Sequence, residues 1–414
     1  AGGNGCHQWH SKGVYQIPYR CYVTPDLDNL FVGGRIISSS HVANGTTRVM
    51  CTSALGGEVI GRAASICLSK GYKPIDLVDR DRIGLLQSLL VKNGNFIPGI
   101  AVAVEDNLAD SAEISVSSVL ELDDLPADGT WFGLDYPIAQ LIPVNGKVPV
   151  VRMNVKADNA TRLVMELRSS SKSENYTPDT IDAVLEFDLK KDENEIVADF
   201  SYSYATPRYA FICLMKNPEI SVPMSGRLVT GLTAVYNYIN PAVSNFGKQV
   251  PPEGIGVEEF EFWCPKRRPE SKNIAMSFAP PLASFNSENL RNSYYRPYIG
   301  TNAWVAAFDD ARPEVCFKWN GRKQIKTIIL YFDTDTDQAM ETVQMGHFDA
   351  CVPTCYREYI IRDSEGKELY HITGNHQTLN VLELDQPVTT DAIYVNFVRP
   401  CGDVCPGLMG VYVC

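Results

Sequence analysis

Residues 150–157 read VVRMNVKA, and residues 162–169 read RLVMELRS. Apolar side chains alternate with polar ones in both segments, which places the apolar set on one face of an extended strand. The segments AVLEFDLK at 183–190 and RYAFICLM at 208–215 continue the pattern after turns rich in Asn and Ser. Short strands at this spacing predict an antiparallel β-sandwich over residues 100–263.

A second β-rich stretch ends the chain. Residues 264–272, CPKRRPESK, are polar and contain two prolines, which is typical of an inter-domain linker. KTIILYFDT at 326–334 and AIYVNFVR at 392–399 predict strands of a second all-β domain over residues 272–414. A domain of about 140 residues buries enough apolar surface to fold alone. The alternative is that its first strand pairs with the sandwich before it.

The first hundred residues mix short strands with two helices. NLFVGGRII at 29–37 predicts a buried strand broken by a Gly pair. Residues 50–70 predict a helix, with Thr46 or Thr47 as its cap and Gly71 just past its end. A second helix is predicted over residues 80–93. Its cap, inward-facing positions and terminating glycine are Asp79, Ile83, Leu86, Leu90 and Gly94.

The first of these helices contains glycines at positions 56, 57 and 61. Each glycine inside a helix costs about 1 kcal/mol relative to alanine. The usual compensation is the close approach of another backbone or of a flat ligand. Tight packing on a sheet is the alternative explanation.

The 414 residues include 37 Lys plus Arg and 49 Asp plus Glu, for a net charge of -12. This balance argues against nucleic acid as a partner of the whole chain. Residues 1–99 carry a net +4 and the remainder -16. A basic segment on an acidic body is typical of a site for an anionic cofactor or substrate, with compositional drift as the alternative. The sequence contains no apolar run long enough to span a membrane and no leader peptide. Because the chain starts at Ala1, we expect it to be a processed product or part of a longer protein.

The N-terminal segment resembles a known family. The motifs that show the resemblance are YQIPYR at 15–20, NLFVGGRIISSSHVANGTTRVM at 29–50 and TSALGGEVIGRAAS at 52–65. Together they resemble the C-terminal end of the flavin-binding domain in the FAD-dependent oxidoreductase family, over residues 14 to about 99. The sequence departs from that pattern at Glu58, where relatives often carry Gln.

The resemblance implies a set of site residues. The implied FAD-binding residues are Gly34, Arg35, Gly56, Gly57 and Gly61, and the implied catalytic residues are His41, Arg48 and Arg20. A helix N-terminus directed at the flavin stabilises the negative charge that develops when flavin accepts a hydride. His41 suits a general acid or base, and Arg48 suits a substrate carboxylate or oxyanion, with Arg20 a weaker candidate for the same role. The alternative for His41 is a loop histidine satisfied by backbone.

The phosphate end of an FAD site has no counterpart in the sequence. FAD is normally held by a βαβ unit with G-x-G-x-x-G. The glycines of AGGNG at 1–5 neither follow a predicted strand nor precede a predicted helix. We therefore expect this chain to lack the N-terminal FAD-binding portion and to bind FAD poorly or not at all by itself.

The tail resembles a discoidin-type, galactose-binding-like jelly roll over residues 272–414. The resemblance begins with EEFEFWCPKRRP at 258–269, NLRNSYYRPYIGTNAWVAAFDD at 289–310 and PEVCFKWN at 313–320. It implies a β-sandwich that binds glycans or surface ligands through variable loops, sometimes with a structural calcium. We expect Asn302 and Trp304 to pack the sandwich rather than contact a ligand.

The sequence gives little indication of a metal site. The alternating Asp333, Asp335 and Asp337 fail the EF-hand pattern at Gln338 and Gln344, so an acidic turn is expected. A zinc site could be assembled from His347, Cys351, Cys355, Cys401 and Cys405. The C-x3-C spacings do not match a zinc knuckle, so disulfides or buried thiols are favoured over zinc.

The sequence thus predicts a multidomain chain. Its parts are a small α/β remnant of an FAD-binding domain over residues 1–99, a β-sandwich over 100–263 and a jelly-roll-like β-sandwich over 272–414. The leading hypothesis is a bacterial FAD-dependent oxidoreductase, periplasmic or extracellular, that transfers a hydride between flavin and a small-molecule or carbohydrate substrate such as a sugar or sugar acid. The alternative is a non-catalytic carbohydrate-binding protein, with a polysaccharide hydrolase or lyase as a third class. The sequence leaves the substrate, the electron acceptor and the oligomeric state open.

Overall fold

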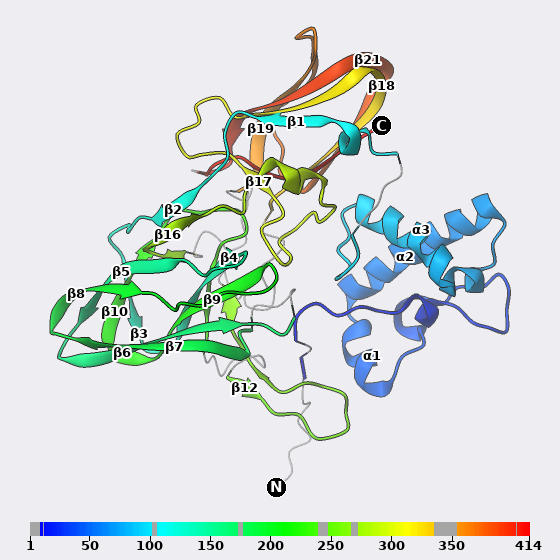
Figure 1. Cartoon of the computed structure of the whole chain (residues 1–414). Helices are drawn as coiled ribbons and strands as arrows, with labels where there is room; N and C mark the ends of the chain where they lie inside the picture. The colour runs from blue at the N-terminus through cyan, green and yellow to red at the C-terminus, as the bar shows by residue number, and fades with distance from the viewer. Residues whose placement is uncertain are drawn as a thin grey trace. The chain divides into compact units, whose positions relative to one another are not determined.

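The chain forms two compact units in the computed structural model (Figure 1). The structure describes residues 9–10, 12–101, 106–172, 177–238, 247–265, 272–334, 354–402 and 404–414. The helical unit comprises Val14–Glu105 with Pro252–Gly256. The β body comprises Ala1–Gly13, Asp106–Pro251 and Val257–Cys414. No helix among the described residues is sufficiently long and apolar to cross a bilayer.

The helical unit contains two long helices joined by a segment that includes a short 3-10 helix. Its elements are η1 (Tyr19–Tyr22), η2 (Gly34–Ile36), α1 (His41–Thr47), α2 (Met50–Lys70), η3 (Pro74–Val78) and α3 (Arg80–Lys92). The predicted bounds of α2 are confirmed, and Gly71 ends it in the left-handed region at φ 69°. The N–H groups of Gly71 and Tyr72 both donate to the carbonyl of Cys67, as expected of a helix that ends at a glycine.

The second predicted helix is confirmed as α3. Its cap is Asp79, whose Oδ1 accepts a hydrogen bond of 3.0 Å from the N–H of Asp81. Leu86 and Leu90 are buried, as the apolar periodicity predicts. The small core of the helical unit consists of Ala63, Cys67, Leu77, Leu86 and Leu90.

Two local predictions in the helical unit are wrong. The N-cap of α2 is Val49, not Thr46 or Thr47, because residues 41–47 form the separate helix α1 and the chain restarts after it. Residues 29–37 do not form a strand. Phe31 makes a single bridge to Val23, and Gly34 adopts φ 64°, which turns the backbone into η2 instead of continuing it.

The β body begins with two antiparallel sheets. One has the order β15-β10-β5-β16-β2, with β3 paired to β10 and β8 paired to β5. Its strands are β2 (Leu122–Leu125), β3 (Trp131–Leu134), β5 (Val150–Ala157), β8 (Asp192–Ala198), β10 (Asn217–Ser225), β15 (Asn273–Ile274) and β16 (Met276–Leu282). The other has the order β14-β11-β4-β9-β6-β7. Its strands are β4 (Ile138–Val144), β6 (Thr161–Ser169), β7 (Thr180–Leu189), β9 (Arg208–Leu214), β11 (Ala234–Tyr236) and β14 (Cys264–Pro265).

A third sheet carries the C-terminal core. Its order is β17-β22-β18-β21-β19-β20, with β1 paired to β18. Its strands are β1 (Glu113–Val116), β17 (Trp304–Val305), β18 (Glu314–Phe332), β19 (Tyr356–Asp363), β20 (Glu368–Ile372), β21 (Leu379–Pro400) and β22 (Gly407–Val413). The remaining elements of the β body are η4 (Leu108–Ser111), η5 (Ser287–Arg291) and the pair β12 (Lys248–Gln249) and β13 (Phe260–Glu261).

The predicted fold class is confirmed. A small, mainly helical N-terminal unit precedes antiparallel sheets, and the alternating segments quoted above lie in β5, β6, β7 and β9. Trp304 is fully buried and its Nε1–H donates to the carbonyl of Ser118 at 2.9 Å. Asn302 is buried and donates to the carbonyls of Arg296 and Tyr298. Both residues therefore pack the fold, as expected.

Strands are exchanged between the sequence segments predicted as separate domains. β16 pairs with β5 and β2, and β15 pairs with β10, although both follow residue 272. In the other direction, β1 lies in the segment 100–263 and pairs with β18 in the C-terminal sheet. The pairing favours the alternative in which the first strand after the linker belongs to the middle sandwich. The boundaries 1–99, 100–263 and 272–414 stay a prediction to be tested by expression.

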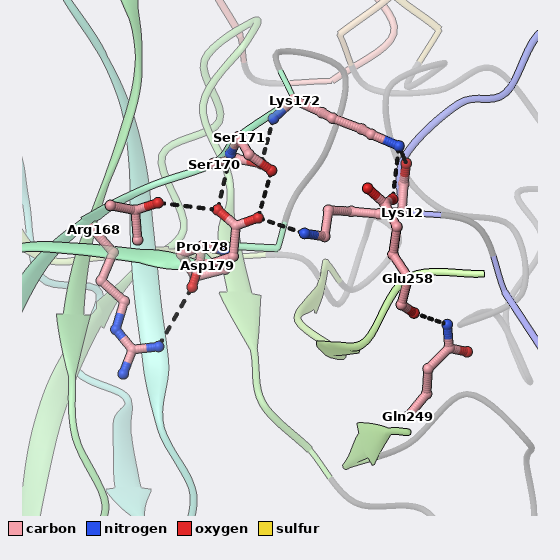
Figure 2. A network of polar contacts seen from close by, with 10 residues as sticks. Lys12, Arg168, Ser170, Ser171, Lys172, Pro178, Asp179, Gln249 and Glu258 are labelled. Carbon is pink, nitrogen blue, oxygen red and sulfur yellow. Dashed lines mark hydrogen bonds and ion pairs between the residues drawn. The ribbon is translucent and has the colours of Figure 1, made fainter. Parts of the chain in front are cut away.

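A polar network fixes the segment before the helical unit onto the β body (Figure 2). Lys12 is 8% exposed, and its Nζ lies 2.6 Å from Asp179 Oδ2. The N–H and hydroxyl of Ser171 also donate to the Asp179 carboxylate. The amide of Gln249 exchanges two hydrogen bonds with the backbone of His10. Every charge in this contact is therefore matched by a partner.

We expect Lys12→Met to lower the free energy of unfolding at neutral pH by about 3 kcal/mol, because it leaves a largely buried carboxylate without its cation. Lys73→Met is the control, since the pair of Lys73 with Asp28 is exposed and little change should follow. Chemical denaturation of both variants measures the difference. Equal effects of the two substitutions would contradict a specific role for the buried pair.

The same contact predicts a pH dependence. Burial alone would raise the pKa of Asp179, but the hydrogen bonds from Lys12 and Ser171 outweigh it and hold the pKa below its ordinary value. The carboxylate therefore stabilises the folded chain above the unfolded pKa, and that contribution is lost as pH falls through the folded pKa. The stability difference between wild type and Asp179→Asn should accordingly shrink when pH falls below about 4.

Candidate functional site

The residues implied as catalytic gather around the junction of α1 and α2. Ser40 caps α1 by accepting a hydrogen bond from the N–H of Ala43, which makes His41 the first helical residue. Arg48 lies between the two helices as the C-cap of α1. η2, which carries Arg35, packs against both α1 and α2. The N–H of Ser38 donates to the carbonyl of Cys21, which brings the η1 segment to the same end.

The charged groups at this end are exposed and carry no ion pair. Arg20, Arg35, His41 and Arg48 are all exposed, and none of them pairs with an acid among the described residues. Acidic residues are scarce between positions 12 and 57, where they occur at 26 and 28. An arginine is a fixed cation, so this end has an unneutralised positive charge that suits an anionic group.

The N-terminus of α2 offers unsatisfied donors. Its cap, Val49, has no side-chain oxygen, so no side chain accepts from the N–H groups of the first turn. Thr47 is buried, and its hydroxyl finds no hydrogen-bond partner among the described residues. A 21-residue helix adds a positive dipole end at this point. The local geometry therefore fits an electron-rich group at the start of α2.

The glycines of α2 have different surroundings. A Cβ on Gly56 would lie 3.0 Å from the ring of Tyr22, so this glycine makes room for a buried aromatic side chain. A Cβ on Gly57 or Gly61 would meet nothing within 4 Å, and both positions are exposed. The open glycines leave one face of the helix free for close approach, whereas Gly56 is accounted for by packing.

Gly56→Ala should therefore destabilise the chain, whereas Gly57→Ala should stabilise it. Alanine at 57 enters open space and should stabilise the chain by up to about 1 kcal/mol through helix propensity. Alanine at 56 must displace Tyr22, and overpacking of this kind costs about 1–3 kcal/mol. Thermal unfolding of the two variants measures the contrast. Equal stabilisation by both would show that Tyr22 does not fill the space beside Gly56.

No pattern in the sequence indicated a role for Tyr22 or Tyr15, and Thr47 was expected only as a possible helix cap. Burial raises the pKa of Tyr22, with smaller contributions from Cys21 and Tyr15. The Tyr15 hydroxyl lies 2.7 Å from the Thr46 hydroxyl and ties the start of the unit to the end of α1. No local pattern marks Tyr15 or Tyr22, because each contacts a residue far along the sequence. Only the glycine at 56 indicated that something packs there.

The residues present fit one end of FAD. The dipole and free N–H groups of α2, the orphaned Thr47 hydroxyl and the open Gly57–Gly61 face fit the flavin ring. The described part of the helical unit has no strand followed by a Gly-rich turn and a helix, so the phosphate end has no cradle here.

The cysteines and acids considered as metal ligands are only partly covered by the structure. No group of His, Cys, Asp or Glu suited to a metal is found where the structure describes the chain. Burial raises the pKa of Cys355 to about 12, and Cys401 is disulfide-bonded. Asp333 is buried and accepts a hydrogen bond from Thr230. His347, Cys351, Asp335 and Asp337 lie outside the described residues.

Comparison with known proteins confirms the N-terminal resemblance. The family model described as FAD dependent oxidoreductase matches residues 1–90. This match covers His41, Arg48, Arg20 and the glycines discussed above. No curated protein matches the chain.

Several solved structures that are similar to part of the chain are carbohydrate-binding modules. The family 32 module of EndoD from Streptococcus pneumoniae has 12% identity and a TM-score of 0.24, covering 32% of this chain and 86% of that one. The family 32 module of NanJ from C. perfringens, solved with galactose, has 11% identity and a TM-score of 0.23, covering 31% and 85%. A GH31 module, CBM32-2 bound to GalNAc, has 10% identity and a TM-score of 0.24, covering 32% and 88%. The fold assignment rests on the strands described above rather than on these scores.

Proposed function

We propose that this chain is the substrate-facing part of an FAD-dependent oxidoreductase that acts on a carbohydrate or a related small molecule. The observation that carries the proposal is the match of residues 1–90 to the FAD dependent oxidoreductase family. The exposed cations and the free helix N-terminus at the α1–α2 junction support it. Bound flavin would supply the chemistry of hydride transfer.

The chain's own residues take distinct roles in this proposal. The first turn of α2, with the Thr47 hydroxyl, holds the electron-rich edge of the ring. Gly57 and Gly61 let the cofactor domain approach the helix. Arg48 binds a substrate carboxylate or oxyanion, with Arg20 in support, and His41 transfers a proton. Gly34 and Arg35 line the same end through η2. Gly56 is proposed with them by resemblance, although Tyr22 explains its small size.

A partner polypeptide is part of the proposal. Large apolar side chains are exposed on the helical unit, among them Ile36 at 74%, Met50 at 84% and Leu68 at 87%. Met50 and Leu68 share one face of α2 with the open glycines, because they are 18 positions, or five helical turns, apart. Apolar surface of this kind marks an interaction site. We propose that a polypeptide with the missing dinucleotide fingerprint covers it.

The 414-residue chain alone should bind FAD poorly or not at all, because it lacks a phosphate cradle. Equilibrium dialysis of the purified chain with FAD measures this directly. Co-expression with a polypeptide that carries the fingerprint should instead give a yellow complex that retains flavin through gel filtration. Stoichiometric FAD on the chain alone would mean that another segment supplies the phosphate contacts.

A carbohydrate substrate is proposed from the fold, because part of the chain is similar to carbohydrate-binding modules. We propose a periplasmic or extracellular location on the same ground. If the co-expressed complex holds no flavin, the alternative is a non-catalytic carbohydrate-binding protein. Glycan binding without flavin, under conditions where the completed chain is folded, would decide for that alternative.

A further inference from the structure

An exposed tryptophan lies on the outer face of a sheet in the β body. Trp131 on β3 is 39% exposed, whereas Trp263, Trp304 and Trp319 are buried. The ammonium of Lys156 on β5 lies 4.0 Å from the centre of its ring. The cation holds the indole in one orientation on the solvent side of the sheet. An exposed indole fixed in this way is not explained by packing.

The strand register places open, flat surface beside this tryptophan. Gly133 pairs with Ser221, Ser221 with Lys156, and Lys156 with Glu193, so these four residues form one row across β3, β10, β5 and β8. Directly opposite residues share a face, and Trp131 shares it with Gly133 two positions away. A Cβ on Gly133 would meet only Asp135 Oδ2, at 3.8 Å. The row therefore leaves the sheet bare next to the indole.

The polar groups of this face include unused hydrogen-bonding capacity. Asn154 is exposed on the same face as Lys156, and neither its amide nor the hydroxyl of Ser221 has a hydrogen-bond partner where the structure describes the chain. Both groups can donate and accept. They lie on adjacent strands, β5 and β10. A ligand that spans them must itself carry donors and acceptors.

Both cations of the face are already paired with acids. Lys156 Nζ lies 3.3 Å from Glu193, and Arg152 lies 3.8 Å from Glu195 on the same pair of strands. The face thus offers no unpaired cation to attract an anion, and its charged rows are unlike the apolar centre of a protein interface. The ligand chemistry that fits is neutral, rich in hydroxyls and apolar on one flat side.

We propose that this sheet face, formed by Trp131, Gly133, Asn154, Lys156 and Ser221, binds a neutral oligosaccharide. A pyranose ring presents C–H groups on its flat faces and hydroxyls at its rim. The C–H face stacks on the indole, and the rim hydroxyls exchange hydrogen bonds with Asn154, Ser221 and the Lys156 ammonium. The bare backbone at Gly133 admits the next sugar unit. This site is separate from the flavin end and does not depend on it.

Isothermal titration calorimetry of the full chain against cellohexaose, xylohexaose and chitohexaose tests the proposal, with polygalacturonate as an anionic probe. At least one neutral oligosaccharide should bind, and Trp131→Ala should weaken that binding by at least about tenfold. The matched control is Phe308→Ala. Phe308 is 40% exposed with Arg227 4.1 Å over its ring, so it reproduces an exposed aromatic under a cation elsewhere on the β body. Its loss should leave the affinity unchanged.

A second variant protects the test against misfolding. Gly133→Val adds volume to the bare row, removes no side chain and suits a strand, so it should fold and still weaken binding by at least about tenfold. The proposal is overturned if no neutral oligosaccharide binds, or if polygalacturonate is preferred. It also fails if Phe308→Ala weakens binding as much as Trp131→Ala, or if folded Trp131→Ala or Gly133→Val binds as wild type does.

Discussion

Arg48→Ala in the flavin-containing enzyme is expected to lower turnover about a hundredfold while flavin content stays close to that of wild type. Removal of one charged donor from a preorganised site raises the activation barrier by roughly 3 kcal/mol. Arg48 is exposed between α1 and α2, one residue before the cap of α2, and has no acidic partner among the described residues. Its charge is therefore available to a substrate, and its loss should leave the fold intact.

Arg80→Ala provides the matched control. Arg80 is also an exposed arginine next to a helix start, but it belongs to α3 and lies outside the proposed site. Steady-state turnover and the flavin absorbance of both purified variants separate catalysis from cofactor retention. Turnover of Arg48→Ala near the wild-type value would exclude the role, and loss of flavin from that variant would assign Arg48 to cofactor binding instead.

Residues 272–414 expressed alone should aggregate, whereas residues 106–414 should be soluble and unfold cooperatively. Cutting before β15 and β16 removes their partners β10, β5 and β2. Ile274, Met276 and Phe278, each at most 3% exposed in the whole chain, would then face solvent on an unpaired edge. The cut also deprives β18 of its pairing with β1. The shorter fragment thus loses partners on both sides.

Gel filtration and thermal melts of the two fragments measure this difference. A third fragment that starts at residue 284, after β16, is the control, because it removes the sticky strands themselves. It should be more soluble than 272–414 while still lacking β1. A soluble 272–414 fragment with a single cooperative melt would instead support the linker at 264–272 as a true domain boundary.

The sequence predicted what depends on neighbours along the chain. Gly71 marked the end of α2, and Asp79 marked the start of α3. The alternating segments predicted β5 and β6 because burial on one face imposes a period of two. These features are local, so residues within a few positions of one another determine them.

Features that depend on distant partners were not predictable. The strand expected at 29–37 gave way to η2, because Gly34 turns the chain and the neighbouring Gly33 lies against Ile60 of α2. Thr46 and Thr47 met the chemistry of a cap, but a separate helix had already used those positions. The exchange of β1 and β16 between sheets leaves no sequence mark. In the candidate site, the residue types followed from the resemblance, whereas the unpartnered Thr47 hydroxyl and the open face at Gly57 depend on the tertiary fold.

The pairing of β1 with β18 also determines when the β body can fold during synthesis of the chain. β1 begins at Glu113 and β18 at Glu314, and β1 therefore leaves the ribosome long before its partner exists. At a translation rate of about 5–20 residues per second, the delay is roughly 10–40 s. In the same way, β2 and β5 are synthesised before β16, with which they pair. The nascent chain therefore carries unpaired strand edges through about half of its synthesis, and the β body completes its fold only after its last third has emerged.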